Sequence, residues 1–295
     1  MPELPEIETV KIQLQKHLVG NVIEKLERLH PKSVVGDVSL VLGNKVTGVR
    51  RFGKMLVIDL THDLHLAIHF KMSGQLIFEP HPNPFLGIER ESSSRIVGGH
   101  PTEDWVKPLP STHTRAIFHF NGGNKMYFND QRIFGWIKIL DSKLLQELKF
   151  LKELGKEPWD LSDEKFHELI TRRKKAVKLV IMDQSIISGV GNIYANDGLW
   201  EAKIHPERQA NSLRSEDSKR LKEGLIKVLR EGIKYGGATA SDAKYINLDG
   251  LGGHYQEHFR TYDRESVKCL RKDGGVISKI VLGGRGTYYC PKCQR

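Results

Sequence analysis

Long apolar runs and cysteines are both scarce in this 295-residue sequence. No stretch approaches the ~20 apolar residues that a membrane-spanning helix needs, and the first twenty residues contain no signal-peptide core. We therefore expect a cytoplasmic protein without a membrane segment. Three cysteines are too few, and odd in number, for a disulfide framework, and two of them form the pair Cys290-Pro-Lys-Cys293. This spacing favours a metal site.

Positive charge, in contrast, is plentiful. The sequence has 46 Lys and Arg against 36 Asp and Glu, which gives a net charge of +10 and a pI of about 9.4. Basic residues concentrate between 172 and 178 and again from 268 to 295. The phosphate backbone of a nucleic acid duplex suits charge that is distributed in this way. On charge alone, RNA or an anionic membrane stays open as a partner.

Apolar periodicity divides the chain into two parts. It predicts a helix over 5–19 that ends at Gly20, followed by strands up to about residue 140. MLVIDL (55–60) and LHLAIHF (64–70) flank a short turn, and RAIFHF and KMYFND flank NGGN, which is typical of a hairpin. The polar segment 80–112 is expected to be a long surface loop. These features predict a β-rich N-terminal domain over about 1–145.

Helical patterns replace strands in the second part. Ser162 is a predicted N-cap for one helix that runs to Ile181, and a longer helix is expected at about 214–235. Between them, Gly189-Val-Gly191-Asn192 precedes a further helix, whose N-terminus either receives a phosphate or merely follows a tight turn. The neighbouring basic run favours the phosphate. The last 35 residues are too few to hold a core unaided, so a bound metal is expected to stabilise them.

Four other stretches leave a functional and a structural interpretation open. In MPELPE, Pro2 either starts a helix or carries a secondary amine after Met1 is removed. Lys54 in RRFGKML is either a solvated turn lysine or a phosphate contact. Met72 in HFKMSGQL lies in a loop, where a methionine gains little unless it fills a space. Arg132 and Phe134 in NDQRIFGW suit base stacking, although a core Phe beside a surface Arg is equally ordinary.

Taken together and in order, the motifs resemble one family over essentially the whole chain. PELPEIE, RRFGKML, HFKMSGQL, NDQRIFG, GVGNIYAND, IHPER and GGRGTYYCPKCQR resemble the motifs of bacterial formamidopyrimidine-DNA glycosylases. The PELPE opening and the Arg132-x-Phe134 pair resemble this branch more than its relative endonuclease VIII, which favours oxidised pyrimidines. The resemblance implies an α+β fold with three parts: a β-sandwich with an N-terminal helix (1–145), a helical domain with a helix–two-turn–helix (146–258) and a zinc-finger-type β-hairpin (259–295).

The resemblance also implies a function and the residues that perform it. The expected activity is removal of 8-oxoguanine and formamidopyrimidines from duplex DNA, followed by cleavage of the strand by β,δ-elimination through a Schiff base. Pro2 would be the nucleophile and Glu3 the general acid, while Lys54 and Arg285 would assist the two eliminations. A catalytically silent DNA-binding protein is a further hypothesis, but it would need none of these four residues.

DNA contacts are implied as well. The space left by an extruded base would be filled by Met72, Arg132 and Phe134. Phosphates would be contacted by His113, Arg173, Lys178 and Asn192. Segment 240–256 would close over the lesion. Extrusion is required because the reacting atoms of a stacked base are out of reach. One chain supplies all of these residues, so a monomer is expected.

The metal site departs from the family pattern of four cysteines in two C-x2-C pairs. Here the second pair is complete, but the first reads Cys269-Leu-Arg-Lys-Asp273. Structural zinc sites almost always have four ligands. Either Asp273 completes the site with Cys269, Cys290 and Cys293, or the hairpin folds without metal. We expect one structural zinc ion.

Overall fold

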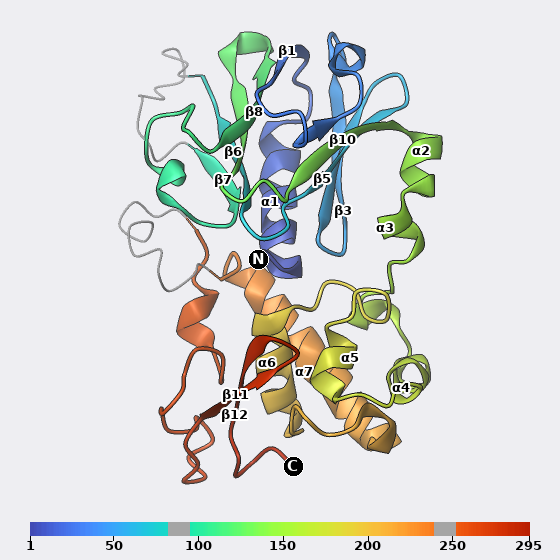
Figure 1. Ribbon diagram of the computed structural model, residues 1–295, viewed down its shortest axis with the longest axis vertical. Coiled ribbons are helices and arrows are strands. Elements are labelled where there is room, and N and C mark those ends of the chain that lie inside the picture. The colour runs from blue at the N-terminus through green and yellow to red at the C-terminus, as the bar shows by residue number, and fades with distance from the viewer. Residues whose placement is uncertain (82–94, 239–251) are drawn as a thin grey trace. The chain divides into compact units, whose positions relative to one another are not determined.

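Two five-stranded sheets form the framework of the first part of the chain (Figure 1). The computed structural model describes residues 1–81, 95–238 and 252–295. One sheet has the order β1 (Ile23–Arg28), β8 (Thr114–Phe120), β9 (Lys125–Asp130), β6 (Gly74–Glu79) and β7 (Ile96–Gly99). The other has the order β2 (Val34–Val35), β10 (Trp136–Asp141), β5 (Leu64–His69), β4 (Met55–Leu60) and β3 (Val46–Phe52). Neighbouring strands are antiparallel except for the β2–β10 pair.

The two sheets and helix α1 (Leu4–His17) share one core. Ile7, Val10 and Leu14 recur at helical spacing and are at most 2% exposed. Alternate residues of both sheets complete the core, such as Leu56 and Ile58 on β4 and Phe118 and Phe120 on β8. Because side chains alternate across a strand, this pattern presents one apolar face of each sheet to the other. The expected N-terminal helix and β-sandwich are confirmed.

Segment 80–112 differs from the expected surface loop. Residues 82–94 lie outside the described residues, but Ile96–Gly99 form β7 at the edge of the first sheet. Trp105, in a 3-10 turn at Glu103–Trp105, packs with Ile77, Ile117 and Tyr127 on the outer face of that sheet. The apolar side chains in this otherwise polar segment therefore form a second, smaller core. On the other sheet, α2 (Ser142–Glu147) and α3 (Lys149–Lys152) cover the outer face.

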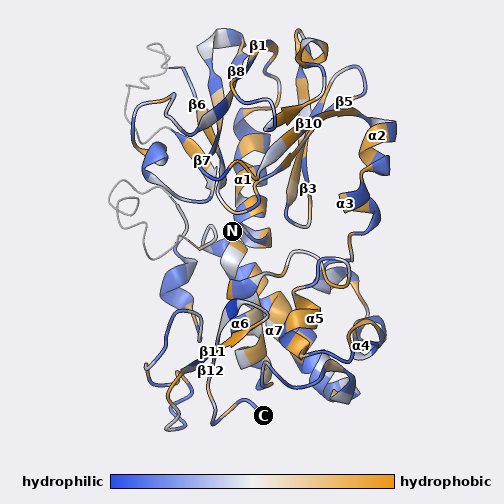
Figure 2. Ribbon diagram, in the orientation of Figure 1, coloured by the Kyte–Doolittle hydropathy of each residue, from blue (hydrophilic) through white to orange (hydrophobic). Residues whose placement is uncertain are grey.

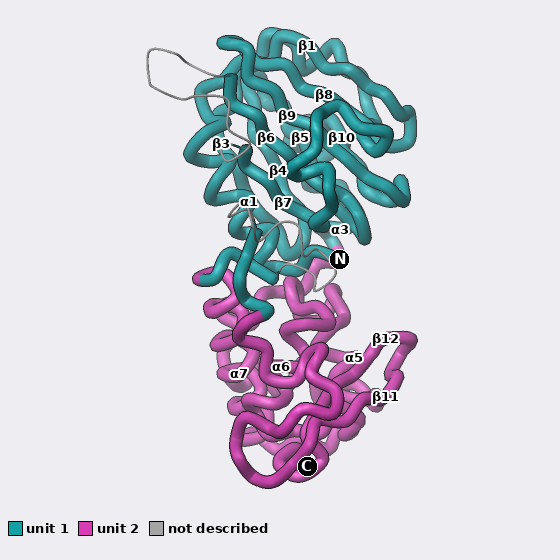
Figure 3. Tube along the Cα trace, turned by 90° about the vertical axis from the view of Figure 1, so that its left-hand side faces the viewer, with its two compact units in different colours: residues 1–152, 235–256 teal, residues 153–234, 257–295 magenta. Residues whose placement is uncertain are grey.

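The chain divides into two units, 1–152 with 235–256 and 153–234 with 257–295 (Figure 3). The second unit contains α4 (Asp163–Thr171), α5 (Val177–Ile181), α6 (Asn192–Ala202) and α7 (Ser215–Lys234). Ser162 caps α4 by accepting a hydrogen bond from Lys165 N. The apolar character of α5 over most of its length is visible in Figure 2 and agrees with its burial.

The expected single helix from 162 to 181 is wrong, because residues 172–176 separate α4 from α5. Four consecutive cations, Arg172 to Lys175, occupy this break, and like charges one turn apart disfavour a helix. Ala176 then pairs with Gln209 in an isolated bridge. The result is two short helices joined by turns rather than one long helix.

A two-stranded hairpin, β11 (Ser278–Leu282) and β12 (Arg285–Tyr289), lies in the C-terminal part of the second unit. Gly283 and Gly284 form its two-residue turn with φ values of 58° and 73°. This conformation is typical of a type I′ turn, which strongly favours glycine. Among the described residues, no helix has the length and apolar character needed to cross a bilayer.

Candidate active site and metal centre

Pro2 and Glu3 are buried immediately before α1. Glu3 is the N-cap of the helix, and its side chain accepts a hydrogen bond from the backbone of Glu6. In return, Glu3 N donates to Glu6 Oε2 over 2.7 Å. This capping box fixes both carboxylates at the start of the helix. Pro5 in the first turn costs the helix no hydrogen bond, since the first N–H groups of a helix have no intrahelical acceptor.

The second carboxylate oxygen of Glu6 holds another segment of the same unit. Ala238 N donates to Glu6 Oε1 over 2.8 Å. A Cβ atom at Gly237 would lie 2.8 Å from Glu6 Cγ, and φ there is +86°, so this contact requires glycine. Most of the segment expected to close over the lesion, 240–256, lies outside the described residues. Its described end begins at Gly252.

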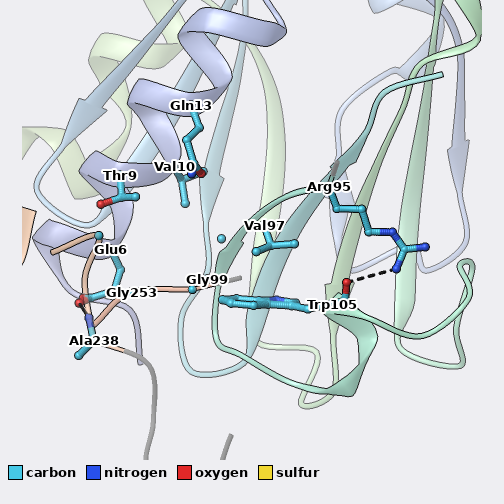
Figure 4. Close-up of a pocket in the computed structure, with 13 residues that line it drawn as sticks. Glu6, Thr9, Val10, Gln13, Arg95, Val97, Gly99, Trp105, Ala238 and Gly253 are labelled. Carbon is cyan, nitrogen blue, oxygen red and sulfur yellow. Dashed lines mark hydrogen bonds between the residues drawn. The ribbon is translucent and has the colours of Figure 1, made fainter. Parts of the chain in front are cut away.

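A cavity of about 150 Å³ lies next to Glu6 (Figure 4). One face of α1, strand β7 and Trp105 form its walls. The buried atoms Trp105 Nε1 and Gln13 Oε1 have no hydrogen-bond partner among the described residues. A buried donor and acceptor of this kind are commonly satisfied by ordered water.

Lys54 lies at the β3–β4 turn, yet only 4% of it is exposed. Arg51 anchors the turn by donating from Nη1 to Gly53 O (3.0 Å) and from Nε to Glu8 Oε2 on α1 (2.6 Å). The interpretation of Lys54 as a solvated turn lysine is therefore wrong. A buried lysine is uncommon in proteins unless its charge has a partner or a function.

His69 was not identified from the sequence and lies close to Lys54. Its Nδ1 accepts a hydrogen bond from Lys71 N (3.0 Å), and the rings of His69 and Phe150 pack nearly at a right angle, with their centroids 5.2 Å apart. Burial, together with the charges of Lys71 and Lys54, lowers the pKa of His69 to about 3. The imidazole is therefore neutral at physiological pH, and the positive charge in this region comes from the two lysines. Such a region suits an anionic group.

Met72, Arg132 and Phe134 are brought to one place by two buried residues. Asp130 accepts hydrogen bonds from Arg132 N (3.1 Å) and Gly135 N (2.6 Å) and from the Ser73 hydroxyl, and Arg132 N also donates to Ser73 Oγ (3.0 Å). These bonds tie the loop that contains Met72 to the loop that contains Arg132 and Phe134.

The side chains themselves point away from the core. Met72 is 39% and Phe134 is 54% exposed, and the Arg132 guanidinium carbon lies 4.9 Å from the centroid of the Phe134 ring. The alternative of a core Phe beside a surface Arg is therefore wrong. Exposed apolar and cationic side chains on loops that are anchored in this way can stack on bases.

His113 and Arg173 have partly or fully exposed side chains. His113 Nδ1 lies 3.0 Å from Oδ2 of the buried Asp104, which leaves Nε2 as the second polar atom of the ring. Arg173 belongs to the exposed basic run that follows α4. Both positions are compatible with contacts to phosphates.

Asn192, Lys178 and Arg285 lie around the hairpin of the second unit. Asn192 is the first residue of α6, and its Nδ2 donates to Gly286 O over 3.1 Å. Lys178 is fully buried, and its Nζ donates to Thr287 Oγ1 (2.6 Å) and Gly286 O (3.2 Å). Arg285 is exposed at the start of β12.

The three cysteines and Asp273 converge on a candidate metal centre. Their ligand atoms all lie within 4.8 Å of one another. Cys269 Sγ is 3.9 Å from Cys293 Sγ, and Cys290 Sγ is 3.7 Å from Asp273 Oδ2. Tetrahedral zinc with Zn–S bonds of about 2.3 Å places its sulfur ligands about 3.8 Å apart. The donor set therefore fits zinc in number, chemistry and spacing.

Neighbouring groups orient these ligands. Asp273 Oδ1 accepts a hydrogen bond from Gly275 N (2.8 Å), and Trp200 Nε1 lies 3.4 Å from Cys269 Sγ. A Cβ atom at Gly275 would approach Cys290 Sγ to 2.4 Å, so only glycine fits at this turn. Burial and the adjacent sulfurs raise the pKa of Cys293. A bound cation would favour the thiolate forms that these contacts disfavour.

The fold and these sites define a helix–two-turn–helix protein with a zinc-finger hairpin, and comparison with family models supports this class. Residues 1–137 match the formamidopyrimidine-DNA glycosylase N-terminal domain and residues 154–244 match the helix–two-turn–helix domain of the same enzymes. Residues 274–295 match the zinc finger found in these glycosylases and in isoleucyl-tRNA synthetase. The last match includes Cys290 and Cys293 but begins after Cys269 and Asp273.

Whole-chain comparisons agree. Formamidopyrimidine-DNA glycosylases of Desulforamulus reducens and Pelotomaculum thermopropionicum are 34% and 36% identical, over 100% of this chain and 99% of each relative. The crystal structure of the Lactococcus lactis enzyme with DNA that contains an abasic site matches with a TM-score of 0.82 and 28% identity, over 100% of both chains. This chain therefore belongs to the formamidopyrimidine-DNA glycosylase family.

Proposed function

We propose that this protein is a DNA glycosylase of base-excision repair that also cleaves the strand, with 8-oxoguanine and formamidopyrimidines in duplex DNA as its substrates. The observation that carries the proposal is the whole-chain match to formamidopyrimidine-DNA glycosylases. Solved structures of the Lactococcus lactis relative contain DNA with an abasic site or a FAPY-dG lesion. The net charge of +10 suits the same partner. We infer that the protein acts as a monomer in the cytoplasm.

The proposed reaction begins at Pro2, which carries a secondary amine once Met1 is removed. Its nitrogen attacks C1′ of the damaged nucleoside, the bond between C1′ and the base breaks, and the base leaves with a proton. Glu3 protonates the ring oxygen, the sugar opens, and the nitrogen–C1′ adduct becomes an iminium. The buried position of both residues immediately before α1 supports this assignment.

Strand cleavage follows from the electron-withdrawing iminium. Loss of a proton from C2′ expels the phosphate on the 3′ side, and a second elimination expels the phosphate on the 5′ side. We assign Lys54 to the first elimination and Arg285 to the second. Burial of Lys54 near Lys71 and His69 supports its assignment, and exposure of Arg285 at the hairpin turn supports the other.

The remaining contacts hold the DNA in the bent, opened form that extrusion requires. Met72, Arg132 and Phe134 occupy the space left by the extruded base, and their exposure on one anchored surface supports this role. His113, Arg173 and Asn192 contact phosphates. Asn192 combines its amide with the N–H groups at the start of the 11-residue helix α6.

Release of damaged bases from defined duplexes tests this function. We expect faster release of 8-oxoguanine opposite cytosine than of thymine glycol. A preference for thymine glycol would instead indicate an endonuclease VIII-like enzyme. Tight binding to abasic DNA without base release would indicate a silent binding protein.

A second variant tests the role of Glu3. Glu3→Gln should bind lesion DNA but fail to release the base, whereas Glu207→Gln, which changes an exposed carboxylate of the second unit, should behave as wild type. Full base release by Glu3→Gln would show that its assignment as general acid is wrong.

We also propose one structural zinc ion bound by Cys269, Asp273, Cys290 and Cys293. The support is the fit of their spacing to tetrahedral zinc. Zinc would stabilise a terminal segment whose core is a small cluster around Cys269, Ile277, Tyr288 and Cys290. Elemental analysis should find about one zinc per chain. Much less than one, with DNA binding intact, would show that the hairpin folds without metal.

A further inference from the structure

Lys178 differs from its basic neighbours in its burial. Arg172, Arg173, Lys174 and Lys175 are exposed, whereas Lys178 is 0% exposed. A buried ammonium group must donate hydrogen bonds to replace those it loses with water. The structure gives the ammonium of Lys178 such acceptors in the hairpin of its own unit, on Gly286 and Thr287.

Lys178 and Thr287 form a directed chain of hydrogen bonds. Its Nζ donates to Thr287 Oγ1 over 2.6 Å, and an ammonium can only donate. The Thr287 hydroxyl therefore accepts from Lys178 and directs its own proton to Arg285 O, 3.1 Å away. Lys178 also donates to Gly286 O (3.2 Å), where Asn192 Nδ2 adds another bond (3.1 Å).

These bonds hold the backbone of residues 285–287 from two helices, since Lys178 lies on α5 and Asn192 on α6. The turn before Arg285 consists of two glycines, which restrict the backbone least. The fully buried Thr287 and its bond with Lys178 therefore hold the backbone from which the exposed Arg285 side chain extends.

We propose that Lys178 is a positioning residue for Arg285 and not a phosphate ligand. This inference rests on the proposed function, in which Arg285 assists the second elimination. Thr287 belongs to the same hydrogen-bonded group, and it has no exposed surface that could contact DNA. An effect of changing Thr287 would therefore indicate positioning of Arg285 rather than a direct phosphate contact.

Two variants test the proposal. Lys178→Met keeps an unbranched side chain, one atom shorter, but removes its charge, and Thr287→Val keeps the shape but removes the hydroxyl. Both should lower the ratio of δ- to β-elimination product about tenfold, the effect of losing a hydrogen bond to a charged donor. Base release should change less than about twofold in either variant. Lys219→Met, at an exposed position of α7, is the matched control and should keep the wild-type ratio.

The salt dependence of DNA binding would reveal a direct contact between Lys178 and a phosphate. Each phosphate contact contributes about −0.9 to the slope of log K against log salt concentration. Arg173→Ala should reduce the steepness of the slope by about that amount, whereas Lys178→Met should leave it unchanged. A reduced slope in Lys178→Met with no effect of Thr287→Val would overturn the proposal, and so would an unchanged product ratio in both variants.

Hydrogen exchange provides a readout that does not depend on activity. Peptides that cover 282–289 should exchange faster in both variants than in wild type and Lys219→Met, and unchanged exchange in both would contradict the positioning role. If wild-type protein released no damaged base, the proposed function would fail, yet this measurement would still decide whether Lys178 fixes the hairpin. Thermal unfolding identifies a variant that does not fold, in which case the other variant carries the test.

Discussion

Replacing Asp273 by alanine is expected to weaken zinc binding about 100-fold. Structural zinc contributes about 10–16 kcal/mol in small zinc-finger peptides, which averages roughly 3 kcal/mol for each of four ligands. Asp273 is as close to its neighbours in the cluster as the cysteines are, because its Oδ2 lies 3.7 Å from Cys290 Sγ, and Cys269 Sγ lies 3.9 Å from Cys293 Sγ. A loss of about 2.8 kcal/mol corresponds to the stated 100-fold change.

Competition with a chromophoric chelator measures this change directly. Wild type and Glu265→Ala, which removes an exposed carboxylate of the same segment, should retain zinc at chelator concentrations that strip Asp273→Ala. Asp273→Cys is not a simple restoration, since a thiol sulfur lies one bond closer to the backbone than a carboxylate oxygen. Equal zinc affinity in wild type and Asp273→Ala would refute the assignment of Asp273 as the fourth ligand.

Three further predictions concern the first unit. Phe134→Ala should weaken binding to lesion DNA about tenfold, as expected for a lost stacking contact, while Leu144→Ala, at an equally exposed position (53% against 54%), should not. Lys71→Gly should raise the free energy of unfolding in urea by ~0.5 kcal/mol, because φ is +51° at this position; an unchanged or lower value would contradict strain there. Burial alone would raise the pKa of Glu8, but its hydrogen bond with Arg51 contributes to a net lowering. The stabilisation from Glu8 should therefore be present above its unfolded pKa and be lost as pH falls through its lower folded pKa. The stability difference between wild type and Glu8→Gln should begin to shrink once the pH falls below about 4.3.

Local sequence signals predicted most of the regular elements. Helix α1, strands β4 and β5 and the β8–β9 hairpin follow from apolar spacing and turn residues that act over a few positions. The metal cluster was also predictable, because Cys290 and Cys293 share a short motif and Asp273 follows Cys269 at only one residue more than the C-x2-C spacing. In each of these cases the residues that interact are close in the sequence or belong to a motif.

Burial of individual polar residues could not be predicted in this way. Lys54 is a turn residue that long-range packing encloses, and the fully buried Lys178 donates to Thr287, 109 positions away. Likewise, Asp130 organises the Arg132 loop through Ser73, 57 positions away. Only the fold brings such partners together, so sequence spacing contains no signal for them.

The central claim is that the nitrogen of Pro2 forms a bond to deoxyribose. Borohydride trapping on a duplex with 8-oxoguanine opposite cytosine, followed by mass spectrometry of the peptides, tests this claim most directly. We predict that the trapped sugar is found on a peptide that begins with Pro2, and that Pro2→Gly loses the adduct while Lys219→Met retains it. A trapped sugar on a lysine side chain, or full strand cleavage by protein that retains Met1, would contradict the account.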